Sequence, residues 1–251
     1  MKVDFCLPAK NEEQILASNI KYLLKFLENQ KLNYFWEIII IINGSQDKSY
    51  LIAKELTEND SRIKIKYLEL GGKGRALKEY FQESRADILV FMDIDLVVAL
   101  DNITPLINPI LNNEADLVMG SRLLPNSHTD RSIWRSFISH TYNILSRVIL
   151  QHSFSDLQCG FKAFRREVFS DLQTKFKDNN WFFDTELIIL AYCRGYKIKE
   201  IPVDWRENRH DVRKSKIKIF KDIWSFLKNL IYFKWRLINL KIDNKNISVK
   251  K

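Results

Sequence analysis

Five consecutive isoleucines, Ile38–Ile42, stand in the segment "WEIIIIING" and restrict the fold more than any other feature of the chain. Isoleucine is apolar and β-branched, so an uninterrupted run of it predicts a strand that buries both of its faces. The Asn-Gly pair that follows is typical of the turn where such a strand ends. A strand of this kind belongs in a parallel sheet with helices packed on both sides.

Strands and helices alternate along the first part of the chain. Apolar runs predict strands at 2–8, 36–44, 62–70 and 87–95, and amphipathic spacing predicts helices at 11–30, 47–60 and 75–85. This order predicts an α/β fold with a mostly parallel central sheet. Such sheets bind ligands outside the carboxyl ends of their strands, so the segments that follow the strands should converge on one crevice. These segments are Pro8–Glu12, Asn43–Ser45, Gly71–Gly74 and Asp93–Asp95.

The second half of the chain is less regular. Strands are predicted at 115–123 and 196–205, and a long basic amphipathic helix at 131–151. No internal repeat or interdomain linker is visible. We therefore expect one domain over residues 1–212, followed by a basic amphipathic extension over residues 213–251.

Positive charge is concentrated near the C-terminal end. The net charge of the chain is +9, but residues 194–251 hold 17 Lys and Arg against 6 Asp and Glu, a balance of +11. The last quarter of the chain therefore predicts an anionic partner. A basic segment with aromatic residues also suits nucleic acid, but no recognised nucleic-acid-binding motif is present, and we expect no such partner.

Cysteine usage and hydropathy indicate a cytosolic protein. The three cysteines, Cys6, Cys159 and Cys193, show no CxxC spacing and predict no disulfide. Asp4 and Pro8 leave no room for the apolar region of a signal peptide. Charged residues interrupt every apolar window of bilayer length, so no transmembrane helix is expected.

Asp93 and Asp95 end the apolar strand in "VFMDIDL". Two carboxylates at such a strand end can bind one cation, although a solvated strand end or a helix cap is the ordinary alternative. Mg²⁺ and Mn²⁺ prefer hard oxygen ligands and commonly combine one or two carboxylates with substrate phosphates. Gln158, in "DLQCG", offers a neutral carbonyl oxygen as a third ligand, the alternative there being a buried structural turn.

Two further segments combine charge with a predicted helix start. The segment "GGKGRA" matches neither the dinucleotide fingerprint nor the P-loop, and its plain interpretation is a turn. Lys73 and the backbone amides at this helix N-terminus would nevertheless suit an anion. Asp184 and Glu186 begin an apolar helix, where they either serve as N-terminal caps or line the acceptor side of the crevice.

The C-terminal extension contains an apolar stripe at helical spacings. The stripe consists of Ile217, Phe220, Trp224, Leu227 and Ile231, and the interleaved lysines are Lys218, Lys221 and Lys228. Aromatic residues opposite lysines are typical of a helix lying in a membrane interface. The alternative is a helix packed on the domain, with its lysines in solvent.

Nine segments in chain order together resemble the family 2 inverting glycosyltransferases of the GT-A fold. They are "LPAKNEE", "INGSQD", "GGKGRAL", "FMDIDL", "MGSRL", "RSFISHTYN", "DLQCGFKAF", "WFFDTELI" and "EIPVDW…SKIK". The chain is most similar to the polyprenyl-phosphate sugar transferases, which include dolichyl-phosphate mannosyl- and glucosyltransferases. The resemblance implies transfer of a hexose from a UDP- or GDP-sugar to a polyprenyl phosphate. It also implies a divalent metal, Mg²⁺ or Mn²⁺. An anionic membrane surface would suit both the +11 charge and a lipid acceptor, so we expect a place on the cytoplasmic face of a membrane.

The resemblance further implies roles for individual residues. The nucleotide base and ribose would contact Pro8, Ala9, Asn11, Glu12 and Asn43, with Lys73 near them or the diphosphate. The metal and the donor diphosphate would bind Asp93 and Asp95, joined by Gln158. The acceptor phosphate would bind Arg122, Arg135 and Ser139, with Lys216 closing over the phosphates.

The donor base and the acceptor stay open at this point. Relatives commonly read Asp-Asp-Gly-Ser where this chain has Ile42–Ser45, and because Asn donates as well as accepts, UDP and GDP both remain candidates. A phosphate acceptor needs no strong base, since the second pKa of a phosphate monoester is about 6. A hydroxyl of a cell-surface glycan would need one, and Asp184 is the candidate for that catalytic role. A sugar nucleotidyltransferase is a further alternative.

Overall fold

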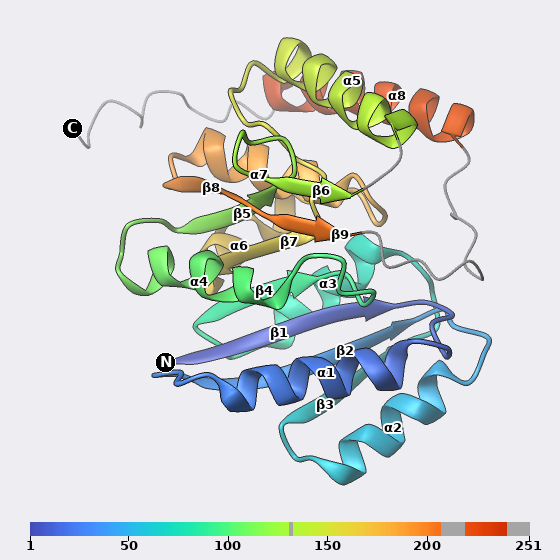
Figure 1. Ribbon diagram of the computed structural model, residues 1–251. Helices are drawn as coiled ribbons and strands as arrows, with labels where there is room; N and C mark the ends of the chain where they lie inside the picture. Colours follow the sequence, from blue (N-terminus) through green and yellow to red (C-terminus); the bar gives the residue numbers. More distant parts are fainter. Residues whose placement is uncertain (131–132, 207–218, 240–251) are drawn as a thin grey trace.

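The chain folds around a seven-stranded sheet with helices on both faces (Figure 1). The computed structural model describes residues 1–130, 133–206 and 219–239. The strands of the sheet are β1 (Lys2–Ala9), β2 (Phe35–Asn43), β3 (Ile63–Leu68), β4 (Ile88–Met92), β5 (Leu117–Ser121), β7 (Phe161–Arg165) and β8 (Ile198–Pro202). A separate two-stranded sheet pairs β6 (His128–Asp130) with β9 (Asp204–Arg206).

Helices connect most of these strands. They are α1 (Leu16–Asn29), α2 (Ser49–Asn59), α3 (Lys73–Glu83), α4 (Ile103–Leu111), α5 (Ile133–Leu150), α6 (Arg166–Leu172), α7 (Phe183–Arg194) and α8 (Ile219–Asn239). Two short 3-10 turns, η1 (Leu100–Asn102) and η2 (Gln173–Lys175), precede α4 and follow α6.

The strand order is β3-β2-β1-β4-β7-β5-β8, and only β7 runs against its neighbours. The pairings β1–β2, β2–β3, β1–β4 and β5–β8 are all parallel. The mostly parallel α/β sheet predicted from the sequence is confirmed. β7 was not predicted, because its segment was interpreted as a turn.

The isoleucine run is buried on both faces, as predicted. Ile38, Ile40 and Ile42 lie in one apolar core with α1, α2 and α4. Ile39 and Ile41 lie in a second core, on the other face, with α3, α6 and α7. Because one residue in two points to each core, a strand covered on both sides must be apolar throughout.

Helices α5 and α8 lie side by side over the α7 side of the molecule (Figure 1). The two helices run in the same direction. The rings of Tyr142 on α5 and Phe226 on α8 lie 5.2 Å apart. Later in both segments, the Lys234 ammonium of α8 donates to Gln151, the residue that follows α5. Leu230 and Phe233 of α8 are fully buried against the second core. One face of the predicted C-terminal helix is therefore packed on the domain. Across the residues described, none of the helices combines the length and the apolar character that crossing a bilayer requires.

Candidate functional site

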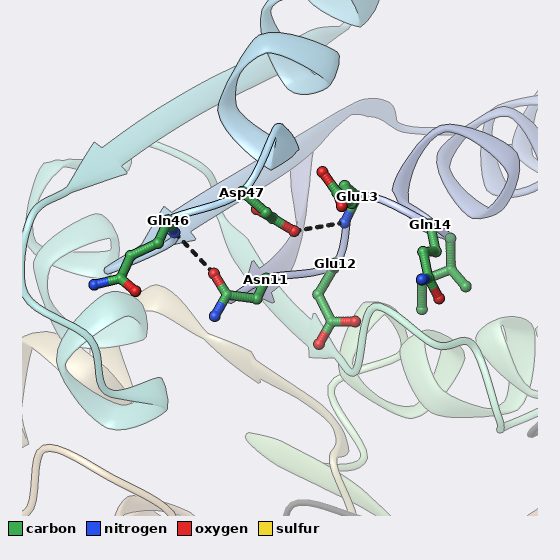
Figure 2. A pocket seen from close by; sticks show the side chains of 7 residues that line it. Asn11, Glu12, Glu13, Gln14, Gln46 and Asp47 are labelled. Carbon is green, nitrogen blue, oxygen red and sulfur yellow. Dashed lines mark hydrogen bonds between the residues drawn. The ribbon is translucent and has the colours of Figure 1, made fainter. Parts of the chain in front are cut away.

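The loops after β1 and β2 are interlocked at the carboxyl ends of these strands (Figure 2). The backbone amide of Asn11 donates to Ser45 Oγ over 3.0 Å, and the amide of Gln46 donates to Asn11 Oδ1 over 2.8 Å. Asn11 has a φ of 54°, a left-handed conformation that Asn tolerates better than most residues. These bonds form one wall of a pocket lined by Asn11, Glu12, Glu13, Gln14, Ile15, Gln46 and Asp47. Pro8 and Ala9, the other residues predicted to contact the nucleotide here, are the last two residues of β1, the strand that leads into this loop.

Asn43 joins three loops through its side chain. Its Nδ2 donates to the carbonyls of Ala9 and Ile41, and its Oδ1 accepts the amide hydrogen of Gly72 over 3.0 Å. Only 3% of the residue is exposed. Both ends of the carboxamide are thus engaged within the protein, and contact between Asn43 and a nucleotide base stays a prediction.

The N-terminus of α3 is closed by the loop before α7. The amides of Gly74 and Arg75 donate to the carbonyls of Asn180 and Asn179. A Cβ on Gly72, which has a φ of 140°, would lie 2.4 Å from the Asn179 carbonyl oxygen. The anion site predicted here therefore cannot use those two amides, and its side-chain component is Lys73.

Lys73 extends from this turn to the carboxylate of Asp93. Its Nζ lies 2.9 Å from Asp93 Oδ1 and 3.4 Å from Asp184 Oδ2, and 7% of its side chain is exposed. Burial alone would lower the pKa of Lys73, but Asp184 and Asp93 outweigh it, and the pKa is raised above its ordinary value. Lys73 is therefore a protonated ammonium held between two carboxylates.

Asp93 and Asp95 follow β4 with Ile94 buried between them. Asp93 keeps 35% of its side chain exposed, and Asp95 is partly exposed as well. The Asp93 amide donates to the Gly160 carbonyl, and a Cβ on Gly160 would lie 2.1 Å from Asp93 Oδ2. The absence of a side chain at position 160 thus allows the Asp93 carboxylate to lie against the start of β7.

Asp184, the candidate base, is enclosed by cations. Lys162 Nζ donates to its Oδ1 over 2.6 Å, Lys73 approaches its Oδ2, and 1% of Asp184 is exposed. Lys162 itself is fully buried and also donates to the Cys159 carbonyl. Lys162 was not predicted as a site residue, although a lysine inside the apolar run "CGFKAF" was the available signal.

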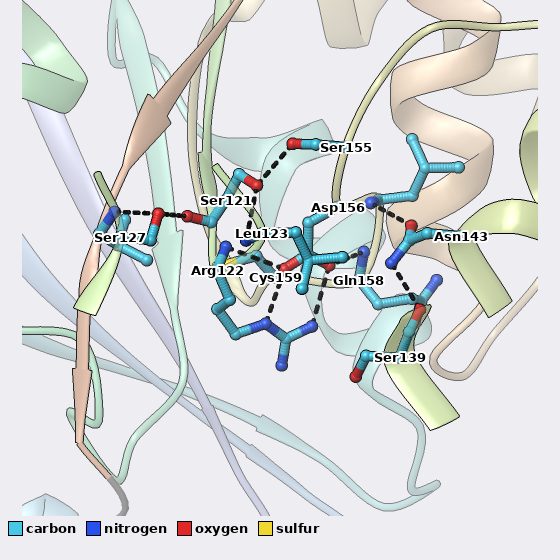
Figure 3. A network of polar contacts seen from close by, with 12 residues as sticks. Ser121, Arg122, Leu123, Ser127, Ser139, Asn143, Ser155, Asp156, Gln158 and Cys159 are labelled. Carbon is cyan, nitrogen blue, oxygen red and sulfur yellow. Dashed lines mark hydrogen bonds and ion pairs between the residues drawn. The ribbon is translucent and has the colours of Figure 1, made fainter. Parts of the chain in front are cut away.

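Arg122 is held in a bidentate ion pair with Asp156 (Figure 3). Its Nε and Nη2 donate to the two carboxylate oxygens over 2.7 and 2.9 Å. Burial raises the pKa of Asp156, but Arg122 outweighs that effect and lowers it to about 2. Ser139 lies on α5, where its carbonyl accepts from Asn143.

Two residues predicted to bind the acceptor phosphate are not placed. The side chain of Arg135 and the whole of Lys216 lie outside the residues whose positions are described. A phosphate site formed with Arg122 and Ser139 stays a prediction.

Gln158 lies in the loop before β7, beside α5 and α7. Its Nε2 donates to Thr185 Oγ1 over 2.7 Å and to the Tyr142 hydroxyl over 3.4 Å. Within the three described stretches, no group of three or more His, Cys, Asp and Glu side chains is placed to hold a metal. Asp93, Asp95 and Gln158 supply oxygen atoms of the kind that a hard divalent cation prefers, and their binding of one ion together stays a prediction.

The sequence was compared with protein families and with curated proteins. The family described as "Glycosyl transferase family 2" matches residues 4–173. Glycosyltransferase AglD of Haloferax volcanii is 33% identical over 94% of this chain, which spans 38% of that protein. Dolichyl-phosphate beta-glucosyltransferases of Trichomonas vaginalis and Drosophila melanogaster are each 31% identical over 86% and 90% of this chain, and it spans 68% and 72% of their lengths.

Solved structures share the fold. Glucosyl-3-phosphoglycerate synthase from Mycobacterium tuberculosis, in complex with uridine-diphosphate, superposes with a TM-score of 0.67 at 19% identity. The match covers 93% of this chain and 79% of that one. The order of strands, the loops gathered at their carboxyl ends and the extent of the family match agree with one another, and this chain belongs to glycosyl transferase family 2.

Proposed function

We propose that the protein transfers a hexose, with inversion, from a nucleotide-diphosphate sugar to a polyprenyl phosphate at a membrane surface. The names of its curated relatives support a lipid-phosphate acceptor, since several are dolichyl-phosphate beta-glucosyltransferases. The bound nucleotide of the solved neighbours is UDP, and this favours UDP over GDP as the donor's carrier.

The environment of Asp184 is the observation that carries the choice of acceptor. Both of its oxygens are ion-paired with buried lysines, so it is poorly placed to take a proton from a sugar hydroxyl. A polyprenyl phosphate already presents an anionic oxygen near pH 7, because its second pKa is about 6. The site is therefore better suited to a phosphate nucleophile than to an alcohol.

Asp93 and Asp95 would hold the divalent metal, with Gln158 as a further oxygen ligand. Solved structures of the neighbouring synthase contain Mn²⁺ or Mg²⁺, which supports this choice of ion. When bound, the ion neutralises charge that develops on the leaving diphosphate. Lys73, which lies beside Asp93 and Asp184, would add a second positive charge at the same group, and Lys162 supplies Asp184 with a further cation.

The acceptor's phosphate would meet the Arg122 side of the crevice. Arg122 is fixed by Asp156, which leaves the guanidinium oriented before any ligand arrives. Helix α5, which carries Ser139, is fixed to this loop as well, since the amide of Leu157 donates to Asn143 Oδ1. Two of the groups that would bind the acceptor, Arg122 and Ser139, thus lie on segments positioned by bonds inside the protein.

The same helix borders an exposed apolar surface. Here the outer apolar surface means Ile144, Leu145 and Val148 of α5 with Ile231, Tyr232, Trp235 and Ile238 of α8, all between 37% and 72% exposed. The α8 residues belong to the basic last quarter of the chain, and α5 packs beside α8. Exposed apolar side chains next to basic charge suit the interface of an anionic membrane. All three cysteines are unpaired, which agrees with the reducing cytoplasmic face.

An acceptor comparison tests the proposed reaction. Purified protein would be given UDP-[¹⁴C]glucose, Mn²⁺ and one of three acceptors: a polyprenyl phosphate, the matching polyprenol, or a glycan with free hydroxyls. We expect radiolabelled lipid with the phosphate alone, and no transfer by Asp95→Asn. Transfer to the glycan instead would establish the hydroxyl-directed alternative, and release of pyrophosphate from UTP and glucose 1-phosphate would establish a nucleotidyltransferase.

Vesicle co-sedimentation tests the membrane assignment. We expect binding to vesicles rich in phosphatidylglycerol at low salt, weaker binding at high salt, and a large loss of binding for Trp235→Glu. Tyr22→Glu is the matched control, since Tyr22 is 60% exposed on α1, which packs in the opposite core. If the wild-type chain does not bind at low salt, the assignment is wrong.

A further inference from the structure

Lys73 stands where a metal would have to bind if Asp93 is a metal ligand. Its ammonium is 2.9 Å from Asp93 Oδ1, with 7% of the side chain exposed. A divalent ion bound to the same carboxylate would lie within a few ångströms of this ammonium, inside a poorly hydrated site. Two cations so close repel each other strongly, because burial weakens screening by water.

Asp184 does not require Lys73 in order to remain neutralised. Lys162 donates over 2.6 Å to Asp184 Oδ1, the oxygen that Lys73 does not approach, and both Lys162 and Asp184 are buried. Lys73 can therefore move away from both carboxylates without leaving Asp184 as a lone buried charge, which would be costly. Asp93, which is 35% exposed, has no such second cation among its described ion pairs.

Lys73 also has the chain length and the position to change partners. It is the first residue of α3, and its flexible four-carbon side chain places Nζ 5.1 Å from the ring centre of Trp181. Trp181 is 58% exposed. The neighbouring amides of α3 are already bonded to the Asn179 and Asn180 carbonyls. The Lys73 ammonium, by contrast, is held by two side-chain carboxylates and by no backbone group among its described contacts.

We propose that Lys73 is a resident counter-cation of Asp93, which the divalent metal displaces and which then binds the diphosphate of the donor. The inference rests on the proposed function, in which Asp93 and Asp95 bind the metal. If Lys73 acts in this way, binding of the metal and binding of the diphosphate are coupled. The metal frees Lys73 for the diphosphate, and the diphosphate draws Lys73 away from Asp93, the carboxylate that binds the metal. Each ligand therefore strengthens binding of the other through one side chain, in addition to their direct contact.

Opposite changes in two affinities distinguish this role from a structural one. In Lys73→Met the competing cation is gone, so we expect Mn²⁺ alone to bind about 10-fold tighter. UDP alone should bind about 10-fold more weakly, because the phosphate partner is also gone. The factor by which UDP tightens Mn²⁺ binding should fall by about 10-fold as well. Electron paramagnetic resonance measures free Mn²⁺, and calorimetry measures UDP.

Lys162→Met is the matched control, because Lys162 shares Asp184 with Lys73 but makes no described contact with Asp93. We expect Lys162→Met to weaken Mn²⁺ binding, the opposite of the neutral Lys73 variants, because Lys73 could then leave Asp184 only by stranding a buried carboxylate. Lys73→Gln, which keeps a hydrogen-bond donor without the charge, repeats the test if the Met variant is poorly folded. Unchanged or weaker Mn²⁺ binding by the neutral Lys73 variants overturns the proposal.

Asp95→Asn separates failure of this inference from failure of the proposed site. If Asp95→Asn binds Mn²⁺ as wild type does, the metal lies elsewhere and the proposed site is wrong. If Asp95→Asn loses Mn²⁺ while neutral Lys73 variants bind it no better than wild type, the site stands and the counter-cation role is wrong.

Discussion

Arg236 of α8 and Glu186 of α7 form a buried ion pair, with 9% and 1% of their side chains exposed. The other oxygen of Glu186 accepts from the amides of Lys177 and Asp178, in the loop whose next residues close the N-terminus of α3. One carboxylate thus connects the C-terminal helix to the turn that carries Lys73.

Arg236→Met should lower the free energy of unfolding by about 3 kcal/mol, since it leaves the Glu186 carboxylate buried without its cation. Arg194→Met is the control, because its ion pair with Asp171 is 45% and 29% exposed. That change should cost less than about 1 kcal/mol. Urea unfolding measures both, and equal losses would contradict a special contribution from the buried pair.

Gly160→Ala should reduce turnover by about 100-fold, because a displacement near 1 Å is enough to misalign a reacting group. The added Cβ would meet Asp93 Oδ2 at 2.1 Å, so the carboxylate has to move. Steady-state rates at saturating Mn²⁺ and donor measure the effect, and thermal melting checks that the fold persists. Wild-type turnover would show that Asp93 tolerates displacement.

Asn43→Asp should destabilise the protein by about 2 kcal/mol, since a carboxylate would face the carbonyls of Ala9 and Ile41 without a hydrogen to donate. Because the Asn43 amide is engaged internally, we expect no change in the ratio of UDP to GDP affinity. Calorimetry with both nucleotides checks this. A reversed preference would mean that position 43 reads the base.

His152 should make the protein less stable below neutral pH. Burial, assisted by Arg147, lowers its pKa from 6.5 to about 4, and its Nδ1 accepts the Phe154 amide hydrogen. The unfolded chain therefore binds this proton more readily, so stability present above pH 6.5 is lost as the pH falls toward 4. Between pH 7 and 5 the loss should be about 1 kcal/mol, allowing for partial solvent screening.

His152→Asn is the comparison for that pH dependence, because its carbonyl oxygen can still accept from Phe154 without titrating. Urea unfolding at both pH values should show a smaller decrease for this variant than for wild type. An identical decrease would assign the pH effect to other groups.

Convergence of the loops that follow the parallel strands was the part that the sequence could predict. Each parallel strand presents the residues that follow it at one edge of the sheet, so the segments of Asn11, Asn43 and Asp93 could be expected at the same edge. β7 is antiparallel and presents the residues that precede it, which is why the arrival of Gly160 beside Asp93 was not foreseen. Lys162 also lies on β7, and its partner Asp184 lies on α7, a later element of the chain. Their ion pair could therefore not be predicted without knowing where β7 lies in the sheet.

The packing of α8 against α5 and the domain could be predicted only in part. Helical spacing indicated an apolar stripe, and packing of α8 on the domain was one of the two alternatives. Spacing alone could not show that α8 buries Leu230 and Phe233 while Trp235 and Ile238 face outward. That division depends on α5, which occupies the adjacent position in space.

Lys73, Lys162, Asp93 and Asp184 carry equal numbers of positive and negative charges, and this has a consequence for ionic strength. A nucleotide-diphosphate sugar and a divalent ion also nearly cancel each other, so loading them together barely changes the local charge. Donor capture should then vary little with added salt. Under the proposed function, association with a phosphate-bearing lipid surface would join unlike charges across water, and salt should then slow the reaction chiefly at that encounter.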